Sequence, residues 1–253
     1  MTTPTSSTTA PQVATRETLT VSEVFGPTIQ GEGPYTGRQV GFIRLGGCNL
    51  HCSWCDTPYT WDASRHDLRL ELGRRTVSSI LAHIDAMDVD TVVLSGGEPL
   101  LQQRQPAWDR LLHGLATLGV DIHVETNGTV APTTITHGYV AHYSVSPKLA
   151  HAGDPEDARI VPEVLATYRR IAAEPEGPAV FKFVARTRRD ILDIAKLVQD
   201  HQLDHRTVWV MPEGTTADEV LDGTRDLIGD VLAAGFNFTT RLHTLIWGQE
   251  RAR

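Results

Sequence analysis

Residues 48–55 read Cys48-Asn49-Leu50-His51-Cys52-Ser53-Trp54-Cys55 and hold all three cysteines of the 253-residue chain. Three thiolates in this C-x3-C-x2-C spacing can bind three irons of a [4Fe–4S] cluster, which ordinarily takes four protein ligands, so one iron stays free for another molecule. Two other uses compete with this interpretation. A zinc site would take His51 or His66 as its fourth ligand, and Cys52 with Cys55 alone has the spacing of a redox pair.

The composition narrows the class of protein. The 23 Lys and Arg residues and 31 Asp and Glu residues give a net charge of −8. Such a chain is repelled by nucleic acid and by anionic membrane surfaces, because phosphate would meet like charge. No apolar run reaches the roughly 18–20 residues that a membrane helix needs, and three cysteines cannot frame a disulfide-stabilised fold. We therefore expect a cytoplasmic protein with neither a membrane nor a nucleic-acid partner.

The chain from Thr18 onward alternates β-rich runs with amphipathic stretches. The runs predict strands over Leu19–Phe25, Gln39–Leu45, Thr91–Ser95, Asp121–Thr126, Tyr139–Val145, Ala179–Val184 and Thr207–Met211. Apolar spacing predicts helices over Thr76–Met87, Trp108–Leu118, Arg189–Val198 and Thr216–Ala234, the last with a break near Gly223 or Gly229. Repeated βα units indicate a parallel sheet covered by helices. We expect one domain, residues 18–253, after a disordered tail over residues 1–17 that is rich in Thr, Ser, Pro and Ala.

A second motif closes one of these strands. Ser95-Gly96-Gly97-Glu98-Pro99 ends the run Thr91–Ser95. With the cysteine spacing and the aromatic residue before the last cysteine, it resembles the radical S-adenosylmethionine (SAM) superfamily, whose GGEP element meets the aminocarboxylate of SAM. The resemblance implies an α/β fold, a partial or modified TIM-type (β/α) barrel. TIM barrels gather their active sites at the carboxyl ends of the strands, which is where these motifs lie.

Three further segments narrow the resemblance. They are Phe25-Gly26-Pro27-Thr28-Ile29-Gln30-Gly31-Glu32-Gly33, Gly41-Phe42-Ile43-Arg44-Leu45 and Cys55-Asp56-Thr57. From about Val21 to Arg241 the chain resembles the 7-carboxy-7-deazaguanine synthase family. That family implies a radical SAM lyase that converts 6-carboxy-5,6,7,8-tetrahydropterin to 7-carboxy-7-deazaguanine with loss of ammonia, in queuosine and 7-deazapurine biosynthesis. The reaction would begin with a 5′-deoxyadenosyl radical generated at a [4Fe–4S] cluster, one per subunit.

The resemblance also assigns roles to single residues. Cys48, Cys52 and Cys55 would ligate the cluster, and Thr57 would bind Mg²⁺, which prefers hard oxygen ligands. The residues implied for SAM are Trp54, Cys55, Asp56, Gly97, Ser146, Pro147, Lys148, Met211, Pro212, Glu213 and Gly214. Those implied for the pterin are Ile29, Gln30, Gly31, Arg44 and Ser95. No side chain is assigned as a catalytic acid or base, because the cofactors carry the radical chemistry.

Several of these side chains have alternative roles. Arg44 lies in an apolar run and needs a carboxylate partner, which a neighbouring Asp or Glu could supply instead of the substrate. The Thr57 hydroxyl could cap the turn before Pro58. Glu125 could be either a polar contact in the site or a structural group. The run Arg241–Trp247 suggests a final strand, in which Trp247 would pack rather than catalyse.

Partners follow from the resemblance as well. It implies a homodimer and an external one-electron donor such as flavodoxin or ferredoxin. The alternative enzyme is a radical SAM activase of a glycyl-radical enzyme, which has the same cysteine spacing and a protein substrate. The alternative from another class is a zinc-binding interaction module without catalysis.

Overall fold

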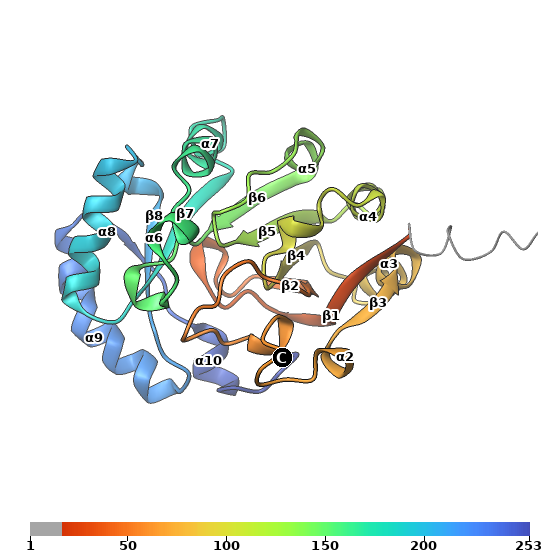
Figure 1. The fold of residues 1–253 in the computed structure, drawn as a ribbon, viewed down its shortest axis with the longest axis horizontal. Coiled ribbons are helices and arrows are strands. Elements are labelled where there is room, and N and C mark those ends of the chain that lie inside the picture. The colour runs from red at the N-terminus through yellow and green to blue at the C-terminus, as the bar shows by residue number, and fades with distance from the viewer. Residues whose placement is uncertain (1–16) are drawn as a thin grey trace, which may run out of the picture.

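The computed structural model describes residues 17–253, so the predicted tail lies outside the described residues except for Glu17. Within that range the strands form one nine-stranded sheet in the order β3-β1-β2-β4-β5-β6-β7-β8-β9 (Figure 1). The strands are β1 (Thr18–Ile29), β2 (Gln39–Leu45), β3 (Gly73–Thr76), β4 (Thr91–Gly96), β5 (Asp121–Thr126), β6 (Val140–Val145), β7 (Ala179–Ala185), β8 (Val208–Pro212) and β9 (Asn237–Phe238).

The sheet is mixed and does not close on itself. β1 pairs antiparallel with β2 and with β3, whereas every pair from β2 through β9 is parallel. The two edges, β3 and β9, stand at opposite ends of the arc. The carboxyl ends of the parallel strands β2 and β4 to β8 therefore meet on one side of the arc, as in a complete barrel.

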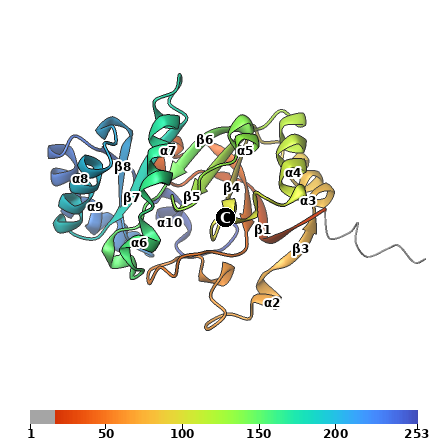
Figure 2. The ribbon, with the colours of Figure 1, turned by 45° about the horizontal axis from the view of Figure 1, so that its top comes forward.

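Helices connect the strands and line the outer side of the arc, as Figures 1 and 2 show for α3, α4, α5, α7, α8 and α9. The α-helices are α2 (Leu68–Glu71), α3 (Val77–Asp85), α4 (Pro106–Thr117), α5 (Thr134–Tyr139), α6 (Glu156–Arg159), α7 (Pro162–Ala172), α8 (Arg188–Asp200), α9 (Ala217–Ala233) and α10 (Leu242–Trp247). The short 3-10 helices are η1 (Gly33–Tyr35), η2 (Pro58–Thr60), η3 (Pro99–Gln102), η4 (Ala150–Ala152) and η5 (His205–Thr207). No helix within residues 17–253 is long and apolar enough to cross a membrane.

Alternation along the strands separates the two faces of the sheet. In β2, Ile43 and Leu45 belong to the main core between the sheet and the helices. Val40 and Phe42 pack with Phe25 and Val93 in a smaller cluster. Side chains alternate between faces with a period of two, so Arg44 shares the inner face with Phe42. An arginine in an apolar strand is thereby aimed into the barrel rather than into the helix layer.

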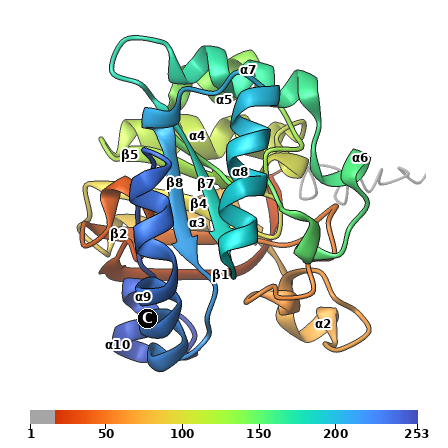
Figure 3. The ribbon, with the colours of Figure 1, turned by 90° about the vertical axis from the view of Figure 1, so that its left-hand side faces the viewer.

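The structure corrects two predictions about the elements and adds a helix that was not predicted. The run Arg241–Trp247 is not a strand, because α10 occupies Leu242–Trp247 and the last strand is β9. The helix predicted over Thr216–Ala234 is continuous as α9: Gly223 packs near Pro212, and Gly229 faces open space. The sequence analysis also missed α7. Figures 1 and 3 place α10 and the C-terminus on the open side of the arc, away from α5 and α7.

Candidate active site

A cavity of about 550 Å³ lies where the cysteine loop meets the ends of the strands. Most of the predicted site residues line it: Ile29, Gln30, Gly31, Arg44, Cys48, Cys52, Trp54, Cys55, Asp56, Thr57, Ser95, Gly97, Ser146, Lys148, Met211 and Glu213. Pro147, Pro212 and Gly214 do not line the cavity, although each follows or precedes a residue that does. Residues that lie more than 180 positions apart in the sequence thus line the same cavity.

The three cysteines occupy the loop between β2 and η2 and carry free thiols. Leu50, Cys52 and Ala152 form a small buried cluster under this loop. The backbone N–H of Ser53 donates to the carbonyl oxygen of Ala152 at 2.8 Å, so η4 holds the loop from below. Burial is the main reason that the pKa of the Cys48 thiol is raised to about 12. A bound cation would deprotonate such a thiol.

The donor set fits an iron–sulfur cluster better than a zinc ion. Within the part of the chain that the structure describes, no three His, Cys, Asp or Glu side chains converge on one metal-ion position. Zinc requires that convergence, and His51 is 70% exposed with its ring 3.5 Å from Asp154. A [4Fe–4S] cluster binds each thiolate to a different iron. Three thiols set around one cavity therefore suit a cluster.

Two glycines bring the end of β4 against the cysteine loop. A Cβ at Gly97 would overlap the carbonyl oxygen of Gly47, and a Cβ at Gly96 would overlap the backbone of Leu45. Gly96 also has φ near +138°, which disfavours residues with a side chain. The Glu98 N–H then donates to the Gly47 carbonyl at 2.8 Å. Only a glycine pair permits this approach.

Glu98 ties three segments of the site together. Its Oε1 accepts from the Leu100 N–H at 3.0 Å, and its Oε2 accepts from the Thr126 hydroxyl at 2.9 Å and the Asn127 N–H at 2.7 Å. The carboxyl is completely buried, which raises its pKa to about 7. The Asn127 amide in turn donates to Asn49 at 3.0 Å. The ends of β4 and β5 and the cysteine loop are thus connected through one carboxyl group.

Glu125 joins two of the predicted pterin residues. Its Oε1 accepts from the Gln30 side-chain amide at 3.1 Å, and its Oε2 accepts from the Ser95 hydroxyl at 2.8 Å. All three side chains line the cavity. Glu125 therefore combines the two roles that the sequence left open, because it borders the cavity and also holds two neighbouring side chains.

Arg44 has a protein partner. Its Nε lies 2.8 Å from Glu23 Oε2, and its guanidinium stands over the Phe25 ring at 5.5 Å. This is the ion pair that the sequence offered as the alternative to a substrate carboxylate. Because Arg44 also lines the cavity, the ion pair explains how the charge is tolerated and leaves the guanidinium at the cavity wall.

A buried ionic network escaped the sequence analysis. Lys182 on β7 pairs with Glu32, and Arg241 pairs with Glu32 at 3.3 Å and with Asp56. The His243 ring lies 3.9 Å from Glu32. Burial alone would raise the pKa of Glu32, but the charges of Lys182 and Arg241 lower it well below its usual range. The signal that could have found the network is a lysine in the middle of the apolar strand Ala179–Ala185.

Several residues predicted for SAM and magnesium contact one another or a cysteine. The Lys148 ammonium donates to the Ser146 hydroxyl at 2.9 Å and stands 5.3 Å from the centre of the Trp54 ring. The Thr57 hydroxyl lies 3.7 Å from Cys55 Sγ and makes no capping hydrogen bond to η2. The capping alternative for Thr57 is therefore not what the structure shows. Glu213 pairs with Arg186 at 2.5 Å.

The C-terminal segment, residues 248–253, completes the wall of the cavity. Arg251 anchors it by pairing with Glu23 and with Glu71, each at 3.0 Å. The Arg251 guanidinium also stacks on the Tyr59 ring at 3.6 Å. Glu23 therefore links this segment to Arg44, and the segment lies across the opening that the incomplete barrel leaves.

Comparison with known proteins agrees with this geometry. Residues 42–146 match the sequence model of the Radical SAM superfamily. The chain is 34% identical over 235 residues to a 7-carboxy-7-deazaguanine synthase of Pyrobaculum aerophilum, covering 92% of this chain and 96% of that protein. The corresponding enzyme of Hyperthermus butylicus is 35% identical over 233 residues, covering 90% and 92%. The chain belongs to the 7-carboxy-7-deazaguanine synthase family. The crystal structure of QueE from Escherichia coli superposes with a TM-score of 0.68 and 25% identity, covering 93% of this chain and all of that one.

The comparisons confirm the family that the sequence motifs predicted. The open nine-stranded sheet confirms the prediction of a partial α/β barrel. As a radical SAM enzyme, the protein uses a [4Fe–4S] cluster and SAM. The donor set described above is suited to the cluster, since its three thiols border the cavity that most of the predicted SAM residues also line.

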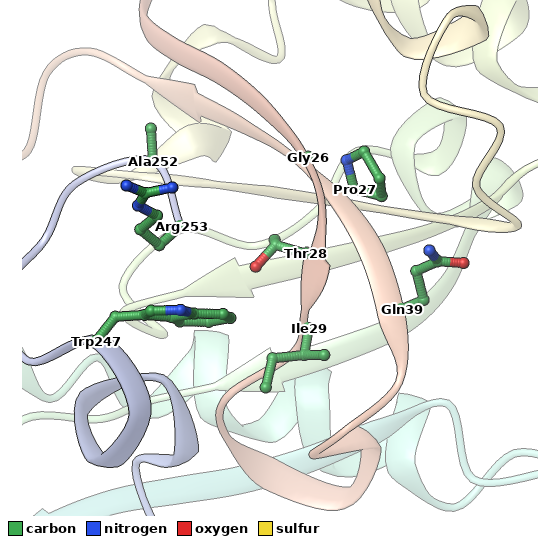
Figure 4. Close-up of a pocket in the computed structure, with 8 residues that line it drawn as sticks. All are labelled: Gly26, Pro27, Thr28, Ile29, Gln39, Trp247, Ala252 and Arg253. Atoms are coloured by element: carbon green, nitrogen blue, oxygen red, sulfur yellow. The ribbon is translucent and has the colours of Figure 1, made fainter.

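A second cavity of about 580 Å³ lies apart from the cysteines (Figure 4). Its wall contains Trp247 from α10 and Thr28 and Ile29 from β1. It shares Ile29, Ala252 and Arg253 with the candidate active site. The Thr28 hydroxyl oxygen is buried without a hydrogen-bond partner. Trp247 thus lines this second cavity and not the one that holds the cysteines.

Proposed function

We propose that this protein converts 6-carboxy-5,6,7,8-tetrahydropterin to 7-carboxy-7-deazaguanine with release of ammonia, as a radical SAM carbon–nitrogen lyase of queuosine and 7-deazapurine biosynthesis. The observation that carries the proposal is the shared cavity, whose wall combines the three cysteines with Gln30, Ser95 and Arg44. Relatives that match nearly the whole chain are named for this synthase activity.

The cysteine side of the cavity would hold the cofactors. Cys48, Cys52 and Cys55 would ligate the cluster, and Trp54 with Lys148 would flank SAM. When bound, these cofactors supply the 5′-deoxyadenosyl radical that removes a hydrogen atom from the substrate. The protein itself would hold SAM and the substrate close together in a fixed orientation, and would exclude water and competing hydrogen donors.

The opposite side would hold the pterin. Gln30, Ser95 and Glu125 already form a hydrogen-bonded row of amide, hydroxyl and carboxylate groups, which suits the donor and acceptor edge of a flat heterocycle. Arg44 keeps Glu23 on its Nε, so its terminal nitrogens would take the carboxylate of the substrate. A bidentate pairing of this kind fixes the orientation of a ligand as well as its charge.

Thr57 would contribute one oxygen to a Mg²⁺ ion whose other ligands come from substrate and water, since Mg²⁺ retains several waters in protein sites. The ion would act as a Lewis acid on the substrate. The Thr57 hydroxyl borders the cavity and is not used by η2, which supports this role.

Further elements of the proposal concern partners. An external carrier such as flavodoxin or ferredoxin would deliver the electron, residues 18–253 would act as one domain, and the enzyme would be a homodimer. A reducing compartment such as the cytoplasm suits free thiols. Sedimentation analysis of the loaded enzyme tests the dimer, and flavodoxin-supported turnover tests the carrier.

One anaerobic assay tests the reaction. The protein is reconstituted with iron and sulfide, and then receives SAM, Mg²⁺, dithionite and 6-carboxytetrahydropterin. We expect mass spectrometry to show 7-carboxy-7-deazaguanine with the wild type and none with Cys52→Ala. If 5′-deoxyadenosine alone appeared, the pterin would be the wrong substrate and the activase alternative would gain. Turnover by Cys52→Ala with an intact cluster signal would contradict the cluster assignment.

A further inference from the structure

One tryptophan beside the cysteine loop contacts a sulfur atom directly. The indole Nε1–H of Trp61 donates to Cys55 Sγ at 3.3 Å. Trp61 follows η2, and its own backbone N–H donates to the Pro58 carbonyl at 3.1 Å. Its ring stands edge-on to His51 at 5.1 Å. Trp61 therefore spans the cysteine loop, from the turn before Cys52 to the sulfur of Cys55.

The other donors near these sulfurs are longer contacts. The Leu50 backbone N–H lies 3.4 Å from Cys48 Sγ, and any residue at that position would supply it. The Asn127 amide lies 3.9 Å from the same sulfur, and the Thr57 hydroxyl lies 3.7 Å from Cys55 Sγ. The Trp61 indole is the shortest of these contacts. It also has no acceptor lone pair, so its hydrogen can only be donated.

We propose that Trp61 is a positioning residue for Cys55, and that its N–H raises the reduction potential of the cluster that Cys55 holds. The inference rests on the proposed cluster. Hydrogen bonds to the sulfurs of an iron–sulfur centre shift its potential. The reduced cluster carries one more negative charge, so an N–H pointing at the sulfur stabilises it more than the oxidised cluster. A cluster that is easier to reduce receives its electron from a weaker donor.

Trp54 provides a matched control in the same loop. It is also a tryptophan that borders the cavity, but its Nε1 is buried without a hydrogen-bond partner. Trp61→Phe removes the donated hydrogen and keeps an aromatic ring beside His51. Trp54→Phe makes the same chemical change where no sulfur receives the hydrogen. Any effect of lost ring size alone is common to both variants.

The experiment is an EPR-monitored redox titration of the reconstituted full chain without SAM. For Trp61→Phe we expect a midpoint potential more negative by up to about 59 mV, the one-electron equivalent of a tenfold change in the ratio of oxidised to reduced cluster. For Trp54→Phe we expect the wild-type midpoint. Equal midpoints for Trp61→Phe and the wild type would overturn the proposal.

A second measurement leaves Trp61 in place, and it tests the contact even if Trp61→Phe fails to bind the cluster. In protein with ¹⁵N-labelled tryptophan and the Trp54→Phe background, pulsed EPR of the reduced cluster should show hyperfine coupling to an indole ¹⁵N. Its absence would refute the contact. Failure of the wild type to bind any cluster would instead refute the proposed function, so the two failures are distinguishable.

Discussion

The buried pair of Lys182 and Glu32 allows a quantitative prediction for Lys182→Met. Lys182 is 5% exposed, and the substitution leaves the Glu32 carboxylate with Arg241 at 3.3 Å as its nearest cation. Removing one partner of a buried ion pair costs about 3–5 kcal/mol. Because Arg241 remains, we expect the lower end, about 3 kcal/mol. In a chain of this size that corresponds to a fall in melting temperature of about 6–12 °C.

The assay is thermal and urea unfolding of the full chain, in a cycle with Glu32→Gln and the double variant. The double variant should recover about 1–3 kcal/mol relative to the sum of the single losses, because no buried charge is then left unpaired. Lys196→Met is the control, since Lys196 pairs with Asp200 on an exposed helix face and should lose at most about 0.5 kcal/mol. Equal losses for the two lysine variants, or strict additivity in the cycle, would refute the argument.

Three further predictions follow from the site and the core. Gly97→Ala should lower the iron content and brown absorbance of reconstituted protein, because its Cβ would overlap Gly47; unchanged loading would contradict this. Burial lowers the pKa values of His123 and His142 to about 4 and 3, so unfolded protein binds more protons and stability should fall from pH 6.5 towards pH 4, by about 3 kcal/mol per histidine. Urea midpoints that stay flat across this range would exclude it. Arg44→Ala should retain the cluster and raise the KM for the pterin severalfold; an unchanged KM removes Arg44 from the site.

The sequence predicts the strands well where apolar runs end at turn residues. The bounds of Gln39–Leu45 and Asp121–Thr126 match β2 and β5. Short apolar runs near the C-terminus are ambiguous between helix and strand, and α10 was predicted as a strand for this reason. Leu242, Leu245 and Ile246 recur at the three- and four-residue spacing of a helix, and this was the available signal.

Some residues of the candidate site could likewise be predicted from the sequence, and others could not. Cysteine spacing and glycine pairs are local, so Cys48 and Gly97 could be predicted from neighbouring residues. The partners of Glu32 lie 150 and 209 positions further along the chain, and no local pattern pairs them. A lysine inside a strand as apolar as β7 shows that a counter-charge exists, but only the fold shows that Glu32 provides it. The same is true of Glu23 as the partner of Arg44.

The open side of the barrel has a consequence for how this architecture can change its chemistry. The ends of the strands and the three cysteines line the candidate active site together with His243 and Thr244 of α10 and residues 248–253. Arg251 holds the segment through Glu23 and Glu71, and Leu242 of α10 donates its N–H to the carbonyl oxygen of Gly31 at 2.9 Å. Substitutions in residues 248–253 would therefore reshape the wall of the cavity while every cysteine stays in place.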